Sequence, residues 1–201
     1  TYIHEIHAGS FHENIKNPFG GIELNNAGYL DTTSFYQSML IYFRSKELLV
    51  NDTFDPSAID FADDYVEYGS LRASKVLFCE GTYLSSNPFF DWLPFSPVKG
   101  DILTVKAPLN IDVIVNRGVF CVPLGDNFYR VGSNYDHEDL TWEPTERGKE
   151  QIEEKLRNLI KTPFETIYQK AGVRPATKDR KPYIGIHPRM DTIGVFNGLG
   201  T

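Results

Sequence analysis

The sequence predicts an α+β fold: an antiparallel sheet with flanking helices, joined to part of a parallel nucleotide-binding sheet. Three observations predict it: strand-like runs separated by hairpin-type turns, two segments with helical periodicity, and two short apolar runs that end in glycine. The antiparallel runs are 101–106, 111–115, 119–124 and 128–133, and the turns between the last three are Asn116-Arg117-Gly118 and Gly125-Asp126-Asn127. The runs that end in glycine are 76–81 and 192–200.

Two amphipathic helices are expected. The first begins after Asp31, a favourable N-cap, and its apolar residues recur with helical spacing at Phe35, Met39, Tyr42 and Phe43. We expect this stripe to belong to the core. The second covers roughly 145–160, with one apolar face made by Ile152, Leu156, Leu159 and Ile160. A short helical turn is expected near 163–170, and the acidic segment 51–72 should form exposed turns and short strands.

Composition and charge exclude several classes of protein. The 201 residues carry a net charge of −7, which argues against a general nucleic-acid surface. No apolar run approaches the roughly 20 residues that cross a bilayer, and no signal segment stands at the N-terminus, so a cytoplasmic protein is expected. Cys79 and Cys121 lie in apolar runs and are expected to be buried, reduced thiols. Because the chain starts at Thr1 and stops in a glycine turn, we expect a truncated piece of a longer protein.

The segment from Gly172 to His187 is the most informative part of the chain. It places Arg174 in a loop rich in proline and glycine, where Pro175 holds the preceding backbone extended. A guanidinium matches a carboxylate with two parallel hydrogen bonds, so Arg174 could bind a carboxylate ligand. A surface arginine paired with a nearby acid is an equally good interpretation of the spacing alone.

The motifs Gly172-Val173-Arg174-Pro175, Thr177-Lys178-Asp179 and Lys181-Pro182-Tyr183-Ile184-Gly185 resemble the C-terminal signature of the glycine oxidase and D-amino acid oxidase family. These are FAD-dependent oxidoreductases of amines and amino acids. Other segments are similar to the family in the same order: Val76–Thr82, Pro97–Asp101, Tyr129–Ser133, Pro144–Glu146 and Gly194–Thr201. The resemblance begins near residue 20 and covers nearly all of the remaining chain.

The resemblance implies a substrate-binding domain, 1–72 and 96–171, and a partial Rossmann-like FAD domain, 73–95 and 172–201. It implies hydride transfer from the α-carbon of a small amine or amino acid to the flavin, with Arg174 pairing the substrate carboxylate. The residues that match the family's flavin-contacting positions are Gly81, Thr82, Arg174, Pro175, Gly198, Leu199, Gly200 and Thr201.

Two departures from the family pattern qualify this expectation. The dinucleotide fingerprint Gly-x-Gly-x-x-Gly is absent, so this chain alone should hold FAD weakly or not at all and should be inactive by itself. Relatives that attach flavin covalently have a cysteine where Pro175 stands here, so non-covalent FAD is expected.

Tyr83, Tyr129 and Tyr135 are candidates for the substrate pocket, although strand alternation alone favours simple packing. His4, His7 and His12 have the spacing nearest to a metal site, but without further ligands we expect no metal there. Two other functions stay open. One is a non-catalytic α+β module that binds a small carboxylate or a protein partner. The other is a flavin enzyme that acts on a modified nucleic-acid base or another macromolecular amine, which the acidic charge disfavours.

Overall fold

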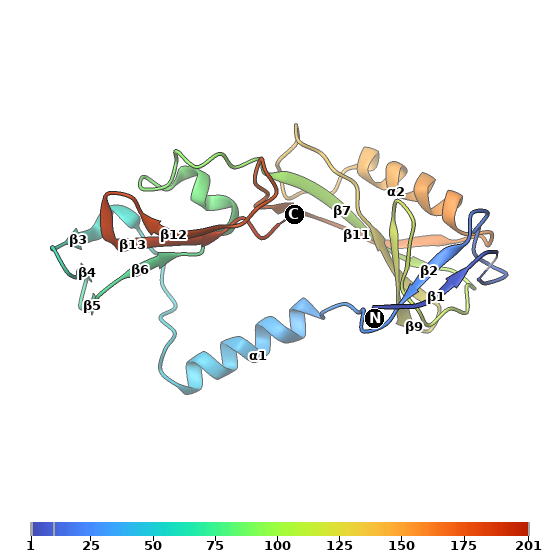
Figure 1. Ribbon diagram of the computed structural model, residues 1–201, viewed down its shortest axis with the longest axis horizontal. Coiled ribbons are helices and arrows are strands. Elements are labelled where there is room, and N and C mark those ends of the chain that lie inside the picture. The colour runs from blue at the N-terminus through green and yellow to red at the C-terminus, as the bar shows by residue number, and fades with distance from the viewer. Residues whose placement is uncertain (1, 10, 201) are drawn as a thin grey trace. The chain divides into compact units, whose positions relative to one another are not determined.

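The computed structural model describes residues 2–9 and 11–200. Thr1, Ser10 and Thr201 lie outside the described residues, so the expectation for Thr201 in the glycine loop cannot be placed. The chain divides into two compact units, Thr1–Phe11 with Asn17–Asp55, and His12–Lys16 with Pro56–Thr201. Figure 1 shows the elements of both.

The first unit consists of a hairpin and one helix. Strands β1 (Ile3–His7) and β2 (Gly21–Leu24) pair antiparallel, and helix α1 spans Thr32–Ser45. The expected cap is confirmed, because the Asp31 carboxylate accepts hydrogen bonds from Thr33 N at 3.1 Å and Ser34 N at 3.3 Å.

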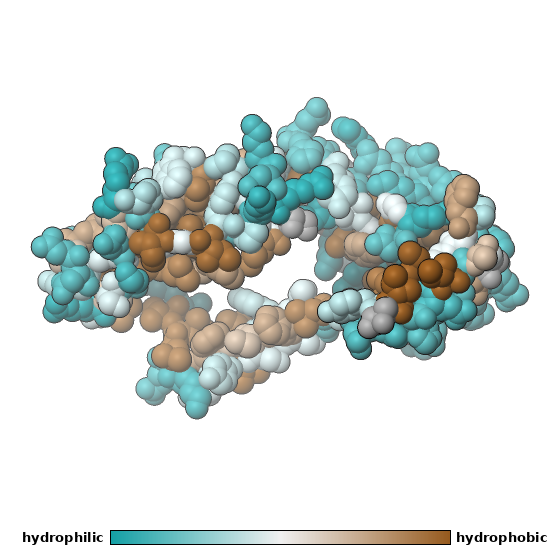
Figure 2. Space-filling view, viewed as in Figure 1, coloured by the Kyte–Doolittle hydropathy of each residue, from teal (hydrophilic) through white to brown (hydrophobic). Residues whose placement is uncertain are grey.

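The expectation that the apolar stripe of α1 is core is wrong. None of the helix residues is buried, and Phe35, Tyr42 and Phe43 are exposed. The described unit contains no second layer against which the stripe could pack, and Figure 2 shows apolar side chains at the surface along this helix. The helical periodicity was nevertheless a correct guide to the helix itself.

The second unit is built around a five-stranded antiparallel sheet. Its strand order is β11 (Glu165–Arg174), β7 (Val98–Lys106), β10 (Phe128–Gly132), β9 (Phe120–Gly125) and β8 (Val115–Asn116). The strands β7 and β11 run side by side through nine paired positions, from Val98↔Arg174 to Lys106↔Glu165 (Figure 1). The helical turn expected near 163–170 is therefore wrong, because the β-branched and aromatic residues there extend the sheet as β11. Most of the run 111–115 lies outside a strand.

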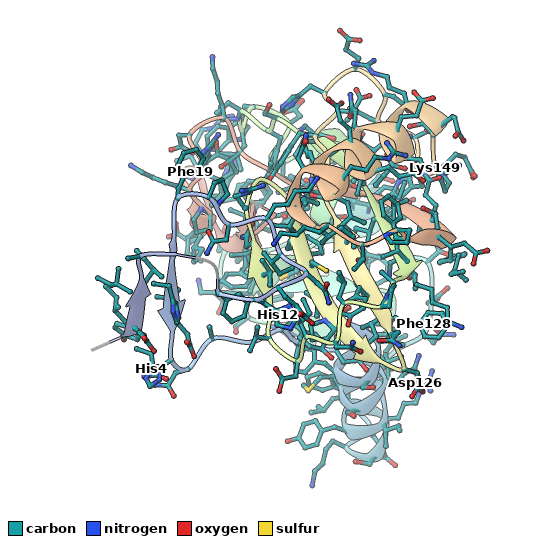
Figure 3. The ribbon with its side chains drawn as sticks, turned by 90° about the vertical axis from the view of Figure 1, so that its right-hand side faces the viewer. His4, His12, Phe19, Asp126, Phe128 and Lys149 are labelled. Atoms are coloured by element: carbon teal, nitrogen blue, oxygen red, sulfur yellow. The ribbon has the colours of Figure 1, made fainter. Side chains whose placement is uncertain are left out.

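Helix α2 (Glu146–Leu159) covers one face of this sheet, as the apolar face at 145–160 predicts. Its buried residues Ile152, Leu156 and Leu159 share a core with Leu103 and Val131. The Thr145 hydroxyl caps the helix by accepting a hydrogen bond from Gly148 N at 3.0 Å. Lys149 lies on the outer side of the helix, and Asp126 and Phe128 lie at the turn of the β9–β10 hairpin (Figure 3).

A second core lies under the remaining strands. One sheet has the order β12 (Tyr183–His187), β13 (Met190–Asn197), β6 (Val76–Phe78), with β13 and β6 parallel, as expected for the runs that end in glycine. The other contains β3 (Ile59–Phe61), β4 (Val66–Tyr68) and β5 (Leu71–Ala73); the short 3-10 helix η1 (Pro56–Ala58) precedes β3, and η2 (Gly81–Ser86) follows β6.

This second core crosses the domain boundary expected at residue 72. Ile59 and Val66, on the expected substrate side, pack with Phe78 and Ile193 from the expected FAD part. The packing favours assigning β3–β5 to the same part as β6 and β13. The functional meaning of the boundary stays a prediction.

The two cysteines have different environments. Cys121 is buried as expected, and burial raises the pKa of its thiol to about 12. The expectation for Cys79 is wrong, because this residue is exposed. It directly follows β6, which pairs only with β13 among the described strands and buries Phe78 but not Leu77.

A partly buried ion pair fixes the loop after β10 to β7. Lys99 is 1% exposed, and its Nζ donates to Asp139 Oδ2 at 2.5 Å and to Thr141 Oγ1 at 3.0 Å. The hydrogen bond from Lys99, with further ones from Thr141, lowers the pKa of Asp139 to about 2.

The depressed pKa of Asp139 predicts acid-sensitive stability. Since an aspartate in an unfolded chain titrates near pH 3.9, the ionised pair stabilises the fold above about pH 4, and this contribution is lost as the pH falls to about 2. We expect Asp139→Asn to lower stability at pH 7 and to flatten the loss of stability between pH 4 and pH 2, measured as urea midpoints. Glu154→Gln, on the exposed side of α2, is the control; parallel curves for wild type and Asp139→Asn would contradict the prediction.

Candidate functional site

Arg174 stands at the end of β11, with its guanidinium only partly satisfied. It pairs with Val98 in the sheet, its Nη2 donates to Ser133 Oγ, and its Cζ lies 5.0 Å from the centre of the Tyr135 ring. The other terminal nitrogen, Nη1, is buried and has no hydrogen-bond partner. Among the described residues no carboxylate lies within ion-pair distance of Arg174, so the interpretation as an arginine paired with a surface acid finds no support.

Gly100 on β7 provides the space that the guanidinium occupies. A Cβ at this position would stand 2.7 Å from Nη1 and 2.8 Å from Cζ of Arg174. Any larger residue would therefore displace the side chain. A buried guanidinium nitrogen without an acceptor is costly, so Nη1 is a donor left unsatisfied among the described residues.

The glycine loop after β13 packs directly on the Arg174-Pro175 peptide. A Cβ on Gly200 would lie 2.8 Å from Pro175 N and 2.9 Å from Arg174 Cβ. Gly198 has a φ of 79°, in the left-handed region that glycine tolerates best. The structure thus brings together Arg174, Pro175, Gly198 and Gly200, while Leu199 between the glycines is exposed.

Asn197 ties a third loop to this group. It is 4% exposed, and its Nδ2 donates to Gly81 O at 2.9 Å, while its Oδ1 accepts from Gly198 N at 2.8 Å. Gly81, with a φ of 60°, opens η2 and is followed by the half-buried Thr82. The candidate flavin contacts at 81–82, 174–175 and 198–200 therefore converge on one side of the unit.

The structure places the three candidate tyrosines in three different environments. Tyr135 lies against Arg174, whereas Tyr83 is 74% exposed on η2. Tyr129 belongs to the core under α2, on the sheet face opposite Arg174, because strand alternation directs its side chain there. The structure therefore does not bring Tyr129 to Arg174.

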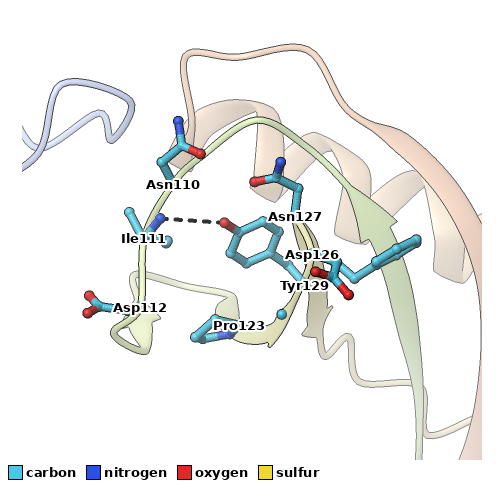
Figure 4. A pocket seen from close by; sticks show the side chains of 9 residues that line it. Asn110, Ile111, Asp112, Pro123, Asp126, Asn127 and Tyr129 are labelled. Carbon is cyan, nitrogen blue, oxygen red and sulfur yellow. Dashed lines mark hydrogen bonds between the residues drawn. The ribbon is translucent and has the colours of Figure 1, made fainter.

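Tyr129 instead borders an open cavity of about 320 Å³ at the far end of the sheet. Figure 4 shows its hydroxyl directed toward Ile111, whose backbone nitrogen donates to it at 3.5 Å. The other lining residues are Asn110, Asp112, Pro123, Gly125, Asp126, Asn127 and Phe128. The neighbouring strand pair Phe128↔Lys106 lies at the opposite end of β7 from Arg174↔Val98, so this cavity is separate from the arginine site.

The histidines do not form one cluster. His4 and His7 lie on β1 in the first unit, and His12 belongs to the second unit. The ligand atoms of His4, Glu5 and Glu23 lie within 4.8 Å of one another, but all three residues are exposed. His7 Nε2 lies 3.3 Å from Glu23 Oε2. Exposed groups in this arrangement do not by themselves indicate a metal site.

A family model described as FAD dependent oxidoreductase (DAO) matches residues 12–201. The chain belongs to the DAO family. The glycine oxidase of Pseudomonas aeruginosa is 26% identical over 136 residues, which cover 65% of this chain and 37% of the relative. The glycine oxidase of Bacillus subtilis is 31% identical over 134 residues, covering 62% of this chain and 36% of the relative. The chain thus spans little more than a third of these enzymes.

Two solved structures share the fold of this DAO-family chain. Iminodiacetate oxidase from Chelativorans sp. BNC1 has a TM-score of 0.72 at 19% identity, covering 92% of this chain and 54% of that one. Amadoriase I from Aspergillus fumigatus has a TM-score of 0.63 at 12% identity, covering 94% and 52%. In the described residues of the DAO-family chain, no helix combines the length and the apolar character that a membrane span requires.

Three residues that position Arg174 and the glycine loop escaped the sequence interpretation of this DAO-family chain. They are Gly100, Ser133 and Asn197, which make space for the guanidinium, bond to it and link the loops. Gly100 and Ser133 stand inside the segments whose resemblance to the family was noted, so their positions carried a signal. Asn197 precedes the glycine loop, and only its burial indicates its role.

Proposed function

We propose that this chain supplies the substrate-binding face and the flavin-facing loops of an FAD-dependent enzyme that oxidises a small amine or amino acid. Arg174 is the observation that carries the proposal. Its buried and unsatisfied Nη1 fits a carboxylate oxygen, and its aromatic neighbour Tyr135 limits the directions from which a ligand can approach.

The residues present also fit a flat cofactor. Gly200 brings backbone close to Arg174 and Pro175, and Gly198 brings it close to Thr177, where side chains would block the approach. Gly81, Thr82, Pro175 and Gly198–Gly200 would hold FAD non-covalently, since no cysteine follows Arg174. Bound FAD would supply the hydride acceptor for the oxidation.

The chain's own part in the reaction is to orient the substrate. Arg174 would fix the carboxylate by a charge-assisted pair of hydrogen bonds, which leaves the α-carbon hydrogen in one orientation. Ser133 would hold the guanidinium in place from the other side. No side-chain base is required if the amine binds in its neutral form. Because the dinucleotide fingerprint is not among these 201 residues, we infer that tight FAD binding needs further residues.

The competing function is a binding module without redox chemistry. It would use the same Arg174 for a small carboxylate, so carboxylate binding alone does not separate the two. Reduction of a bound flavin by the ligand distinguishes the enzyme from the binding module.

The test is anaerobic mixing of the full-length protein, purified with FAD, with small amino acids. We expect a yellow protein whose flavin absorbance bleaches with an amino acid and bleaches far less with the corresponding amide, which lacks the carboxylate. A protein that binds carboxylates but whose flavin is never reduced by amines would overturn the enzymatic proposal in favour of the binding module.

A further inference from the structure

A second cation shares the face of the sheet that presents Arg174. In β11 the side chains alternate between faces, so Arg174, Gly172 and Lys170 lie on one face, opposite the α2-covered face that carries Asp101 and Leu103. The cross-strand partners of these three residues on β7 are Val98, Gly100 and Ile102. Lys170 is exposed and has no hydrogen-bond or ion-pair partner among the described residues.

The two glycines between these cations bring their charged ends within reach of one ligand. The Arg174 guanidinium leans over Gly100, so it already lies beside the pair formed by Lys170 and Ile102. Diagonal neighbours in an antiparallel pair are separated by about 7–8 Å, a distance that a lysine side chain spans. With no side chain on Gly100 or Gly172, backbone lines the sheet between Arg174 and Lys170, and Trp142 borders this surface, since a Cβ on Gly172 would stand 3.9 Å from Trp142 Cζ3.

The floor beside the two cations is apolar. Gly132 lies next to Ile102 on one side and Phe120 on the other. A Cβ on Gly132 would stand 3.1 Å from Phe120 Cζ and 3.2 Å from Ile102 Cγ1, so these two side chains lean together over the glycine. Such a floor suits the methylene groups of a short ligand rather than another charge.

The charge on the part of this face around Arg174 and Lys170 is of one sign. From the Val98 row to the Thr104 row it carries Arg174, Lys170 and Arg130 and no acidic residue, in a chain whose net charge is −7. The Nε of Arg130 is also buried without a partner. Glu165, the acid of β11 on this face, pairs with Lys106 at the far end.

We infer that the substrate carries a second acidic group, a carboxylate separated from the first by a short methylene stem, and that Lys170 binds it. This inference rests on the proposed function and narrows its substrate class to amines with two carboxylates. Lys170 is a specificity-determining residue in this scheme, while Arg174 holds the carboxylate next to the reacting carbon.

The test compares succinate with butyrate, two unreactive acids of equal length, by calorimetry on the full-length protein purified with FAD. We expect succinate to bind about 10- to 100-fold more tightly, the range of one charge-assisted contact. Lys170→Gln should reduce succinate to the affinity of butyrate and leave butyrate unchanged, whereas Lys170→Arg should retain the preference. Lys161→Gln, an exposed lysine elsewhere, should change neither.

The outcomes separate this inference from the function on which it rests. If succinate binds no better than butyrate, or if Lys170→Gln weakens both alike, Lys170 is an ordinary solvated lysine and the inference fails while the arginine site stands. If neither acid binds and no amino acid reduces the flavin, the proposed function and the inference fail together. Faster flavin reduction by aspartate than by alanine, lost in Lys170→Gln, would support the inference independently.

Discussion

Replacing Arg174 by alanine is expected to weaken the binding of carboxylate ligands about 10- to 150-fold, the equivalent of about 1.5–3 kcal/mol for a charge-assisted contact. The expected loss is large because the guanidinium is already held in place. Ser133 bonds to Nη2, Tyr135 lies under the group, and Gly100 leaves room for it, so little further ordering opposes binding. In the complete enzyme the change should appear as a higher KM for amino acids.

Two variants and one substrate distinguish a carboxylate role from a structural one. Arg174→Lys keeps the charge but loses the two-pronged geometry, so it should recover only part of the affinity. Arg189→Ala removes an exposed arginine from the β12–β13 turn and should leave KM unchanged. The KM for an amide substrate should be the same in Arg174→Ala and in wild type. If KM for carboxylate substrates is the same in Arg174→Ala and wild type, Arg174 does not bind the substrate carboxylate.

Arg174 and the loops beside it could be predicted from the sequence, because short segments contain the residues that determine their conformation and chemistry. Arg174-Pro175 and Gly198–Gly200 owe their conformations to proline and glycine at fixed positions, and the structure places them against one another. That juxtaposition depends on β11 and β13 meeting in space. The family resemblance supplied that information, and single-residue propensities did not.

What sequence could not supply is the pairing of distant strands. Whether Tyr129 or Tyr135 lies near Arg174 depends on which face each presents, and this is fixed by the register of β10 on β7. Lys170 is an ordinary residue in sequence and gains interest only because it shares a face with Arg174. Likewise, the apolar stripe of α1 shows which face of the helix could pack against another element. Periodicity does not show whether such an element is present.

A buried carboxylate shows how the sheet positions both the helix and the ligand face. Asp101 lies on β7 between Gly100 and Ile102, which belong to the ligand face, and its own side chain points to the helix side. It is 1% exposed, and its Oδ1 accepts from Thr145 N at 3.2 Å and from Gln169 Nε2 at 2.8 Å. A Cβ on Gly148 would stand 2.5 Å from Asp101 Cγ, so the first turn of α2 rests directly on this carboxylate. The positive end of the helix dipole favours a negative charge there.

Asp101→Ala should therefore lower the free energy of unfolding by about 2–4 kcal/mol, because it leaves Thr145 N without its acceptor, takes one of two acceptors from Gln169 Nε2 and removes a charge from the start of α2. Asp101→Asn keeps the volume and one acceptor oxygen and should cost less. Urea unfolding of the purified protein measures both, with Glu150→Ala on the exposed side of the same helix expected to stay within about 0.5 kcal/mol of wild type. A loss for Asp101→Ala no larger than that of Glu150→Ala would mean that α2 is held by its apolar face alone. A large loss would instead show that one side chain anchors the helix, and with it the strands that align Arg174 and Lys170 on the opposite face.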